Sequence, residues 1–230
     1  MAGKLIVDNS AKAEMTEKIV YFLRDRYKNI ELGNKEDPLD ELIFILLTVK
    51  TDYRHYESIW KAFKKRFPSW ERVIESDIND VATVILSGGM QNQKATRIVN
   101  ALIYLQQTTN RFSLDFMNKL SDEDSEKFLL NIPGVGKKVA RCVLLFSLHR
   151  QVLPIDSNIM RVAKRIGLIA SGFNENENPD LLQEITPREI RHDFHVCLVS
   201  LGRELCTISS PRCIICPLVS MCNYGREVLK

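Results

Sequence analysis

The sequence contains little glycine and no long apolar run, and each shortage excludes a class of protein. Glycine accounts for 10 of 230 residues and runs of β-branched residues are short, which argues against an all-β fold. No apolar stretch approaches the ~18–20 residues that a membrane-spanning helix needs. The first residues, MAGKLIVDNSAKAEM, lack the apolar core of a secretory signal. We therefore expect a cytoplasmic protein with no membrane partner.

Net charge is also small, so the distribution of charge is more informative than its sum. The 32 basic and 29 acidic residues leave a net charge of +3. Residues 137–165 nevertheless hold seven basic side chains and a single acidic one. The seven are Lys137, Lys138, Arg141, Arg150, Arg161, Lys164 and Arg165. A second basic cluster contains Lys61, Lys64, Lys65 and Arg66. Both clusters are either solvated helix faces or surfaces that neutralise phosphates.

Apolar side chains recur at helical spacing along nearly the whole chain, which predicts an all-α protein. Asp37 and Pro38 are expected to open a buried helix, because proline suits the first helical turn. Ser121 starts a capping box, and Asn79 is expected to cap another helix. Further helices are expected over residues 14–27, 53–67, 92–107, 138–149, 157–166 and 187–201, with a polar loop at 171–180.

Four of the six cysteines lie within the last 25 residues, and their spacing indicates a metal site. Clustered cysteines in a cytosolic chain favour metal binding over disulfides. The spacing is C-x6-C-x2-C-x5-C, formed by Cys206, Cys213, Cys216 and Cys222. One tight pair with long, unequal flanks favours the corners of a [4Fe–4S] cluster, although a zinc ion also accepts four cysteines. The other two, Cys142 and Cys197, are expected to be buried small hydrophobic residues.

The stretch IPGVGKK at residues 132–138 is expected to link two helices. Gly134 and Gly136 permit positive φ and a close approach of the backbone to a ligand. The free N–H groups that open the second helix would form an anion site with the helix dipole, and a DNA phosphate fits such a site. The alternative is a plain turn between two helices.

Two ionisable residues are candidates for catalysis. Lys138 is expected on the first turn of an apolar helix beside Lys137 and Arg141, an environment that favours the neutral, nucleophilic amine. Asp156 follows 18 residues later. Its carboxylate would face a developing sugar cation or a bound water, or it would simply cap the following helix.

The hairpin NIPGVGKKVA, the aspartate after 18 residues and the cysteine spacing occur together and in this order. This combination resembles the endonuclease III family of helix-hairpin-helix DNA glycosylases, over about residues 14–224. The resemblance implies a [4Fe–4S] cluster on the four clustered cysteines. It also implies that Lys138 forms an imine with the substrate sugar, that Asp156 is the catalytic aspartate, and that the hairpin from Gly134 through Val135 and Gly136 to Lys137 binds DNA.

The family fold implied by this resemblance is two helical lobes with the active site in the cleft between them. A six-helix barrel containing the helix-hairpin-helix would span residues 31–150. The cluster domain would be discontinuous, formed by residues 1–30 and 151–230. The expected partner is double-stranded DNA with a modified base or an abasic site, bound by a monomer that would associate with the nucleoid in a bacterium.

Three positions depart from the endonuclease III pattern. Lys50 stands where the family has a glutamine that fills the space left by the flipped base. Met90 replaces the leucine wedge, and Asn158 replaces a histidine after the catalytic aspartate. All three are expected to contact DNA, and features around Met90 and Asn158 are similar to the plant 5-methylcytosine glycosylases.

The resemblance implies a bifunctional glycosylase and AP lyase of base excision repair that removes a modified pyrimidine and cleaves the abasic strand by β-elimination. Two alternatives remain open at this stage. One is a glycosylase without lyase activity that acts on mismatched or methylated pyrimidines. The other is an iron–sulfur DNA-binding protein without catalytic activity.

Overall fold

The computed structural model describes residues 9–174 and 178–230, and every described element is helical. The predicted all-α class is therefore confirmed. The N-terminal residues 1–8 and part of the expected polar loop, residues 175–177, lie outside the described residues. Among the described helices, none is both long and apolar enough to cross a membrane.

The chain divides into two compact units. Unit 1 comprises Met1–Leu32 with Gln151–Lys230, and unit 2 comprises Gly33–Arg150. Unit 1 contains α1 (Asn9–Tyr27), α9 (Ser157–Ile166), α10 (Leu181–Ile185), α11 (Arg191–Glu204) and α12 (Asn223–Val228). Unit 2 contains α2 (Pro38–Thr48), α3 (Tyr56–Arg66), α4 (Trp70–Glu75), α5 (Ile78–Val84), α6 (Gln91–Thr109), α7 (Asp122–Asn131) and α8 (Lys137–Cys142).

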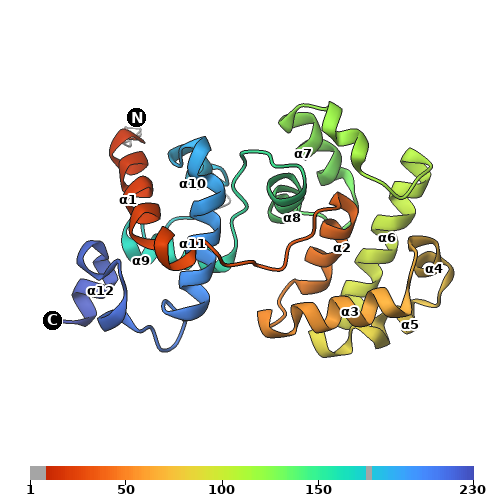
Figure 1. Cartoon of the computed structure of the whole chain (residues 1–230), viewed down its shortest axis with the longest axis horizontal. Helices are drawn as coiled ribbons and strands as arrows, with labels where there is room; N and C mark the ends of the chain where they lie inside the picture. Colours follow the sequence, from red (N-terminus) through yellow and green to blue (C-terminus); the bar gives the residue numbers. More distant parts are fainter. Residues whose placement is uncertain (1–8, 175–177) are drawn as a thin grey trace. The chain divides into compact units, whose positions relative to one another are not determined.

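Unit 1 is built around α11, whose apolar side chains meet those of α1 and α9. Both α1 and α10 pack against neighbouring helices of this unit, as Figure 1 shows. Its core includes Leu23, Val162, Phe194 and Leu198, all with no exposed side-chain surface. Burial of such aliphatic and aromatic side chains contributes about 1.5–3 kcal/mol each, so α11 is the element on which this unit depends.

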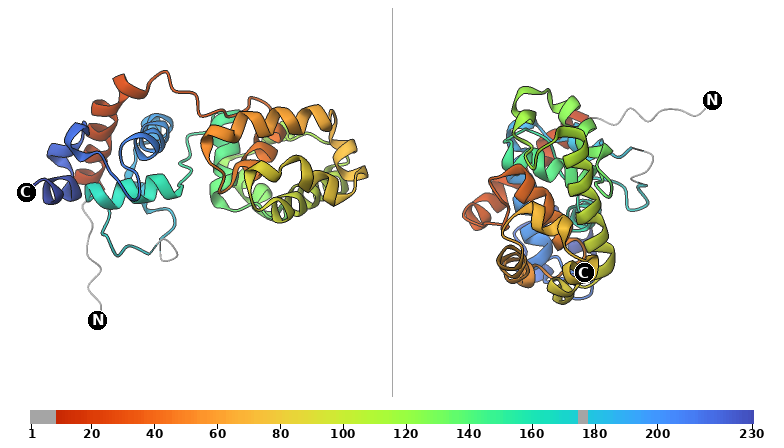
Figure 2. Two further views of the ribbon diagram at one scale, coloured as in Figure 1. Left: turned by 90° about the horizontal axis from the view of Figure 1, so that it is seen from below. Right: turned by 90° about the vertical axis from the view of Figure 1, so that its right-hand side faces the viewer.

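Unit 2 surrounds α2, which is apolar nearly all round because its neighbours cover every face. Asp37 caps α2 by accepting hydrogen bonds from the backbone N–H groups of Leu39 and Asp40, as the sequence predicts. The helices α3, α6 and α8 all contact α2. The helices α5 and α6 pack side by side, and they can be followed in Figure 2.

Three local predictions are wrong, and the helix expected over 187–201 has the same fault as the first of them, because Arg188–Ile190 is a 3-10 turn and α11 begins at Arg191. Residues 53–67 do not form one helix, because Asp52 caps a 3-10 turn, Tyr53–His55, that precedes α3. Asn79 is not the cap of α5: the side chain of Asp77 is, and it accepts from the backbone N–H of Asn79 at 2.7 Å.

The third wrong prediction concerns residues 138–149. The α-helix ends at Cys142, and Val143–Ser147 continues as a π-helix. The backbone N–H of Leu148 donates to the carbonyl of Val143, five residues back. Apolar periodicity could not reveal this change, because the side chains on both sides of it are buried.

Candidate active site

The glycine hairpin lies between α7 and α8, as predicted. Gly134 has a φ of +82°, and a Cβ built there would lie 2.8 Å from Cγ of Arg97, so only glycine fits. Gly136 has a φ of −99°, which any residue adopts, and open space surrounds it. The positive φ that glycine permits is therefore adopted at Gly134 and not at Gly136. Val135 is buried.

Lys138 is half-buried on the first turn of α8, beside the half-buried Lys137. A buried carboxyl group, Glu41 of α2, interacts electrostatically with Lys138. Glu41 accepts hydrogen bonds from the backbone N–H of Lys35 at 2.7 Å and from the side chain of Asn34. Burial raises the pKa of Glu41 to about 7, although these hydrogen bonds and the charge of Lys138 act in the opposite direction.

The sequence suggested that Arg141 supplies a positive charge beside Lys138, and the structure corrects this. Arg141 is buried, and its Nε lies 2.9 Å from Oε1 of Glu126, so its charge is compensated there. The charged group that sequence reasoning missed is Glu41. Its position in an apolar helix was visible in the sequence, but its distance of nearly 100 residues from the hairpin hid the relation.

Asp156 caps α9, and its two carboxylate oxygens have different partners. The backbone N–H of Ile159 donates to Oδ1 at 2.8 Å, and Nδ2 of Asn158 donates to Oδ2 at 3.0 Å. Asn158 in turn accepts from Nη2 of Arg161 at 2.8 Å. The predicted cap is confirmed. Asn158, which was expected to contact DNA, orients the Asp156 carboxylate within this unit.

Arg161 connects this group to the segment that carries the clustered cysteines. Its Nη2 donates to the carbonyl of Gly202 at 2.9 Å, and its Nε donates to the carbonyl of Cys206 at 2.9 Å. The chain before Asp156 is also fixed. Nδ1 of His195 lies 2.8 Å from the carbonyl of Pro154, and the side chain of Gln183 accepts from the backbone N–H of Leu153. Sequence reasoning found none of these supports.

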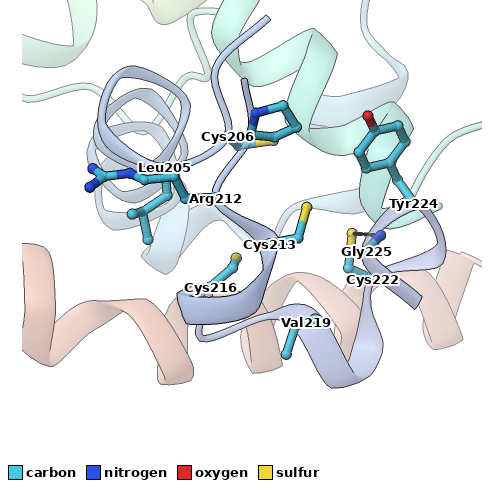
Figure 3. A pocket seen from close by; sticks show the side chains of 10 residues that line it. Leu205, Cys206, Arg212, Cys213, Cys216, Val219, Cys222, Tyr224 and Gly225 are labelled. Atoms are coloured by element: carbon cyan, nitrogen blue, oxygen red, sulfur yellow. Dashed lines mark hydrogen bonds between the residues drawn. The ribbon is translucent and has the colours of Figure 1, made fainter. Parts of the chain in front are cut away.

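The four clustered cysteines line a single pocket in unit 1, and Figure 3 shows their side chains around it. None of them forms a disulfide. Donors approach two of the sulfurs: Nη1 of Arg165 lies 3.4 Å from Sγ of Cys206, and the backbone N–H of Gly225 lies 3.3 Å from Sγ of Cys222. Burial and the neighbouring thiols raise the pKa of Cys216 and of Cys222. Thiols this close would repel one another as thiolates unless a cation bound them.

Within the described part of the chain, no three histidine, cysteine, aspartate or glutamate side chains converge as they would on a single metal ion. The other two cysteines, Cys142 and Cys197, are buried as predicted, and burial raises the pKa of Cys197 to about 12. Cys142 and Cys197 therefore act as unreactive apolar side chains in this fold.

The two basic clusters are largely engaged within the protein. In unit 1, Lys164 and Arg165 donate to backbone carbonyls. In unit 2, Arg150 donates to the carbonyls of the segment before α7. Ion pairs join Lys61 to Glu57, Lys64 to Asp40 and Arg66 to Asp80. A count of charges along the sequence therefore overstated the free positive surface.

Lys50 and Met90 occupy two neighbouring loops of unit 2. Lys50 follows α2 and Met90 precedes α6, and both side chains are exposed. Both have positive φ, 53° for Lys50 and 52° for Met90, which is uncommon for residues other than glycine. A hydrogen bond from Oγ1 of Thr51 to the carbonyl of Gly88 joins the loops at 2.8 Å. The structure thus brings these two predicted DNA contacts together.

Lys138 belongs to unit 2 and Asp156 to unit 1. Their meeting at one cleft stays a prediction.

The chain resembles known proteins in sequence, although no family model matches it. It is 29% identical over 195 residues to an Arabidopsis thaliana protein named "Putative DNA glycosylase", a stretch that covers 80% of this chain and 66% of that protein. It is 27% identical over 206 residues to endonuclease III of Thermotoga maritima, covering 89% of this chain and 92% of the relative. It also matches the DNA glycosylase/AP lyase ROS1 of Arabidopsis thaliana at 27% identity, covering 67% of this chain but only 12% of ROS1. The chain thus spans less than two thirds of several plant relatives.

Solved structures show the same fold. A trapped covalent intermediate of endonuclease III with DNA superposes with a TM-score of 0.82 at 20% identity, covering 95% of this chain and 99% of that one. A thermostable thymine-DNA glycosylase superposes with a TM-score of 0.77 at 21% identity, and the match covers 95% of this chain and 98% of that one. The chain is therefore a homologue of endonuclease III and of plant DNA glycosylases, and it has the helix-hairpin-helix glycosylase fold.

Proposed function

We propose that this protein is a DNA glycosylase of base excision repair that also cleaves the abasic strand. The observation that carries the proposal is Lys138, a half-buried lysine on the first turn after a glycine hairpin, in a homologue of endonuclease III. A neutral amine at this position is a nucleophile for the sugar carbon C1′. The open backbone at Gly136 leaves room for a phosphate beside it.

The reaction requires a nucleotide turned out of the helix, because the sugar carbon is shielded in stacked DNA. Asp156 stabilises the positive charge that grows at C1′ as the bond to the base breaks. The amine of Lys138 forms a bond to C1′, the base leaves with the bonding electrons, and the ring opens to an imine. Loss of a proton from C2′ then expels the 3′ phosphate, which cuts the strand.

We propose that Cys206, Cys213, Cys216 and Cys222 would hold a [4Fe–4S] cluster. What supports this proposal is that the four thiols line one pocket and that N–H donors reach two of the sulfurs. A bound cluster would fix this loop and stabilise its thiolates. Arg161 connects this loop to Asp156, because it donates hydrogen bonds both to the carbonyl of Cys206 and to Asn158, which is a partner of Asp156.

We propose a modified or mispaired pyrimidine as the substrate, opposite guanine. Lys50 can only donate hydrogen bonds, and guanine presents two acceptors, O6 and N7. Oxidised pyrimidines fit the homology to endonuclease III. Methylated cytosine and thymine opposite guanine are the rival substrates, because the features around Met90 and Asn158 resemble the plant 5-methylcytosine glycosylases. A monofunctional enzyme acting on these is the second candidate.

The test is a panel of duplexes, each with one modified base, scored separately for base release and for strand cleavage. Borohydride is added to a parallel set, because it reduces an imine to a stable covalent link. We expect wild type to be trapped, Lys138→Ala to give no trapped product, and Lys137→Ala to be trapped with weaker DNA binding. Undiminished trapping of Lys138→Ala would reassign the nucleophile to Lys137. Base release without trapping in wild type would establish the monofunctional alternative, and neither activity would leave only DNA binding.

A further inference from the structure

A buried lysine joins the two loops that carry Lys50 and Met90. Lys94 lies on α6 with 2% of its surface exposed. Its Nζ donates to Oγ1 of Thr51 at 2.6 Å and to the carbonyl of Gly88 at 2.7 Å. The hydroxyl of Thr51 also donates to the Gly88 carbonyl, at 2.8 Å. Ammonium, hydroxyl and carbonyl thus form a closed triangle, the Lys94 triangle, across the two loops.

The charge of Lys94 is buried without an opposite charge. Among residues 9–174 and 178–230, no carboxylate forms an ion pair with it, and desolvation lowers its pKa to about 8. Burying an ammonium in this way is costly. A methionine could fill a similar volume without the cost, so what the lysine adds is its pair of directed hydrogen bonds.

The packing at Gly88 shows that the triangle is tightly enclosed. A Cβ built on Gly88 would lie 3.2 Å from Nζ of Lys94, 3.3 Å from Oγ1 of Thr51 and 3.1 Å from Cδ1 of Ile59. Each distance is shorter than ordinary van der Waals contact. Glycine at this position is therefore what lets the ammonium and the hydroxyl reach the same carbonyl.

The Lys94 triangle is directly beside the two residues expected to enter the DNA. Lys50 immediately precedes Thr51, and Met90 follows Gly88 by two residues. Both have left-handed backbone conformations, which persist only where the surroundings hold them. The triangle fixes one end of each strained segment, and it fixes them to each other.

We propose that Lys94, acting through Thr51, is a positioning residue that holds Lys50 and Met90 as one unit. Insertion of Met90 into the base stack and contact of Lys50 with the opposite base are then coupled. The inference rests on the proposed DNA function of this face, and it assigns to Lys94 a role in DNA probing, whereas Lys138 carries the chemistry.

A double-mutant cycle tests the coupling. Lys50→Ala and Met90→Ala are made singly and together in wild type, and the rate of borohydride trapping on duplex abasic DNA is measured. If the two substitutions acted independently, the trapping rate of the double variant would fall by the product of the two single reductions. We expect it to be about tenfold faster than that, because either single substitution already disrupts the joint action of Lys50 and Met90. Each rate is divided by the rate of the same variant on single-stranded abasic DNA, where no base stack must be opened. Any change in the reactivity of Lys138 then cancels.

The same cycle is repeated in Thr51→Val, which removes the hydroxyl, and in Thr51→Ser, which keeps it. The two backgrounds are matched, because each changes Thr51 by little volume. We expect the coupling to vanish in Thr51→Val, which removes both bonds between the loops, to weaken in Lys94→Met, which leaves the bond from Thr51 to Gly88, and to persist in Thr51→Ser. Additive effects in wild type, or equal coupling in Thr51→Val and Thr51→Ser, would overturn the proposal even if Lys94→Met failed to fold.

A second readout separates this inference from the lyase proposal. A duplex carries a tetrahydrofuran abasic analogue with 2-aminopurine at the neighbouring position, whose fluorescence rises when it unstacks. We expect wild type and Thr51→Ser to raise the signal and Thr51→Val to raise it several-fold less. If wild type forms no imine but this pattern holds, the lyase proposal fails and the positioning role stands. If trapping occurs and the Thr51 variants give equal fluorescence, the positioning role fails.

Discussion

The segments that carry Lys138 and Asp156 are held in place by different means. Lys138 lies on a helix packed against α2, with the buried Glu41 as its charged neighbour. Asp156 is held by a chain of hydrogen bonds that ends at the carbonyl of Cys206. The lysine therefore depends on an apolar core and one buried carboxyl group, whereas the aspartate depends on a polar network tied to the cysteine pocket.

The largest effect is expected at Asp156, where capping and catalysis can be separated. Asparagine caps helices about as well as aspartate, so Asp156→Asn should keep the cap at Ile159 and lose only the hydrogen bond from Asn158, at a cost to stability of about 1 kcal/mol. Turnover should fall by ~10²-fold or more, because the charge that stabilises the sugar cation is lost. Single-turnover base release and circular dichroism melting measure the two. Turnover within a few-fold of wild type would leave Asp156 with the cap alone.

Removal of a thiol from the cysteine pocket should affect the segment that carries Asp156 more than the segment that carries Lys138. The purified protein should contain iron and sulfide in equal amounts, about four of each per chain. Cys213→Ser should lose most of both and its visible absorbance, and its base release should fall while Lys138 remains trappable. Cys197→Ala, which removes a buried thiol outside the pocket, is the control and should keep its iron. Stoichiometric zinc in wild type purified without air would contradict the cluster.

Glu41 makes the stability of unit 2 depend on pH. Its folded pKa of about 7 lies above the usual 4.5 of a glutamate carboxyl group, so the folded state holds the proton more tightly. This stabilisation is complete below pH 4.5 and is lost as pH rises through 7. Between pH 5.5 and 8 the loss should be about 2 kcal/mol, and Glu41→Gln should remove it.

The measurement uses urea unfolding followed by tryptophan fluorescence. Both tryptophans, Trp60 and Trp70, lie in unit 2, so the signal reports that unit. Glu57→Gln, which changes an exposed carboxylate, is the matched control and should keep the wild-type slope. Parallel slopes for wild type and Glu41→Gln would show that burial does not control this carboxyl group.

The smallest effect is expected at Lys50, which is exposed. Wild type should act faster on a lesion opposite guanine than opposite adenine, by up to about tenfold for one good hydrogen-bonding pair. Lys50→Gln should reduce that preference, because glutamine both donates and accepts. Met90→Leu, which changes the neighbouring wedge without changing its polarity, should keep it. Equal rates with both partners in wild type, unaffected by Lys50→Gln, would show that Lys50 does not contact the opposite base.

The features that the sequence predicted well are local in the chain. The cap at Asp37, the turn at Gly134 and the grouping of four cysteines each depend on residues a few positions apart. Spacing is enough to recognise them, because backbone geometry leaves little freedom over such distances. The helical class follows from periodicity for the same reason.

The features that the sequence missed depend on contacts between distant segments. Lys94 reads as a surface lysine on an amphipathic helix until Thr51 and Gly88 are placed around it. Arg141 contributes to a basic cluster until Glu126 is found beside it. A charged side chain is free or engaged according to tertiary structure, so a net charge taken along the chain could not predict the free positive surface.

The π-helix after Cys142 changes the direction in which the side chains that follow it point. It inserts one residue into a helical turn, so that every later side chain is rotated relative to α8. One such side chain is Ser147, whose hydroxyl donates to the carbonyl of Lys35 at 2.8 Å. Lys35 is also the residue whose N–H holds Glu41. Regular α-winding with the same number of residues would turn Ser147 away from Lys35 by about 100°, so the extra residue in this turn is what allows the contact.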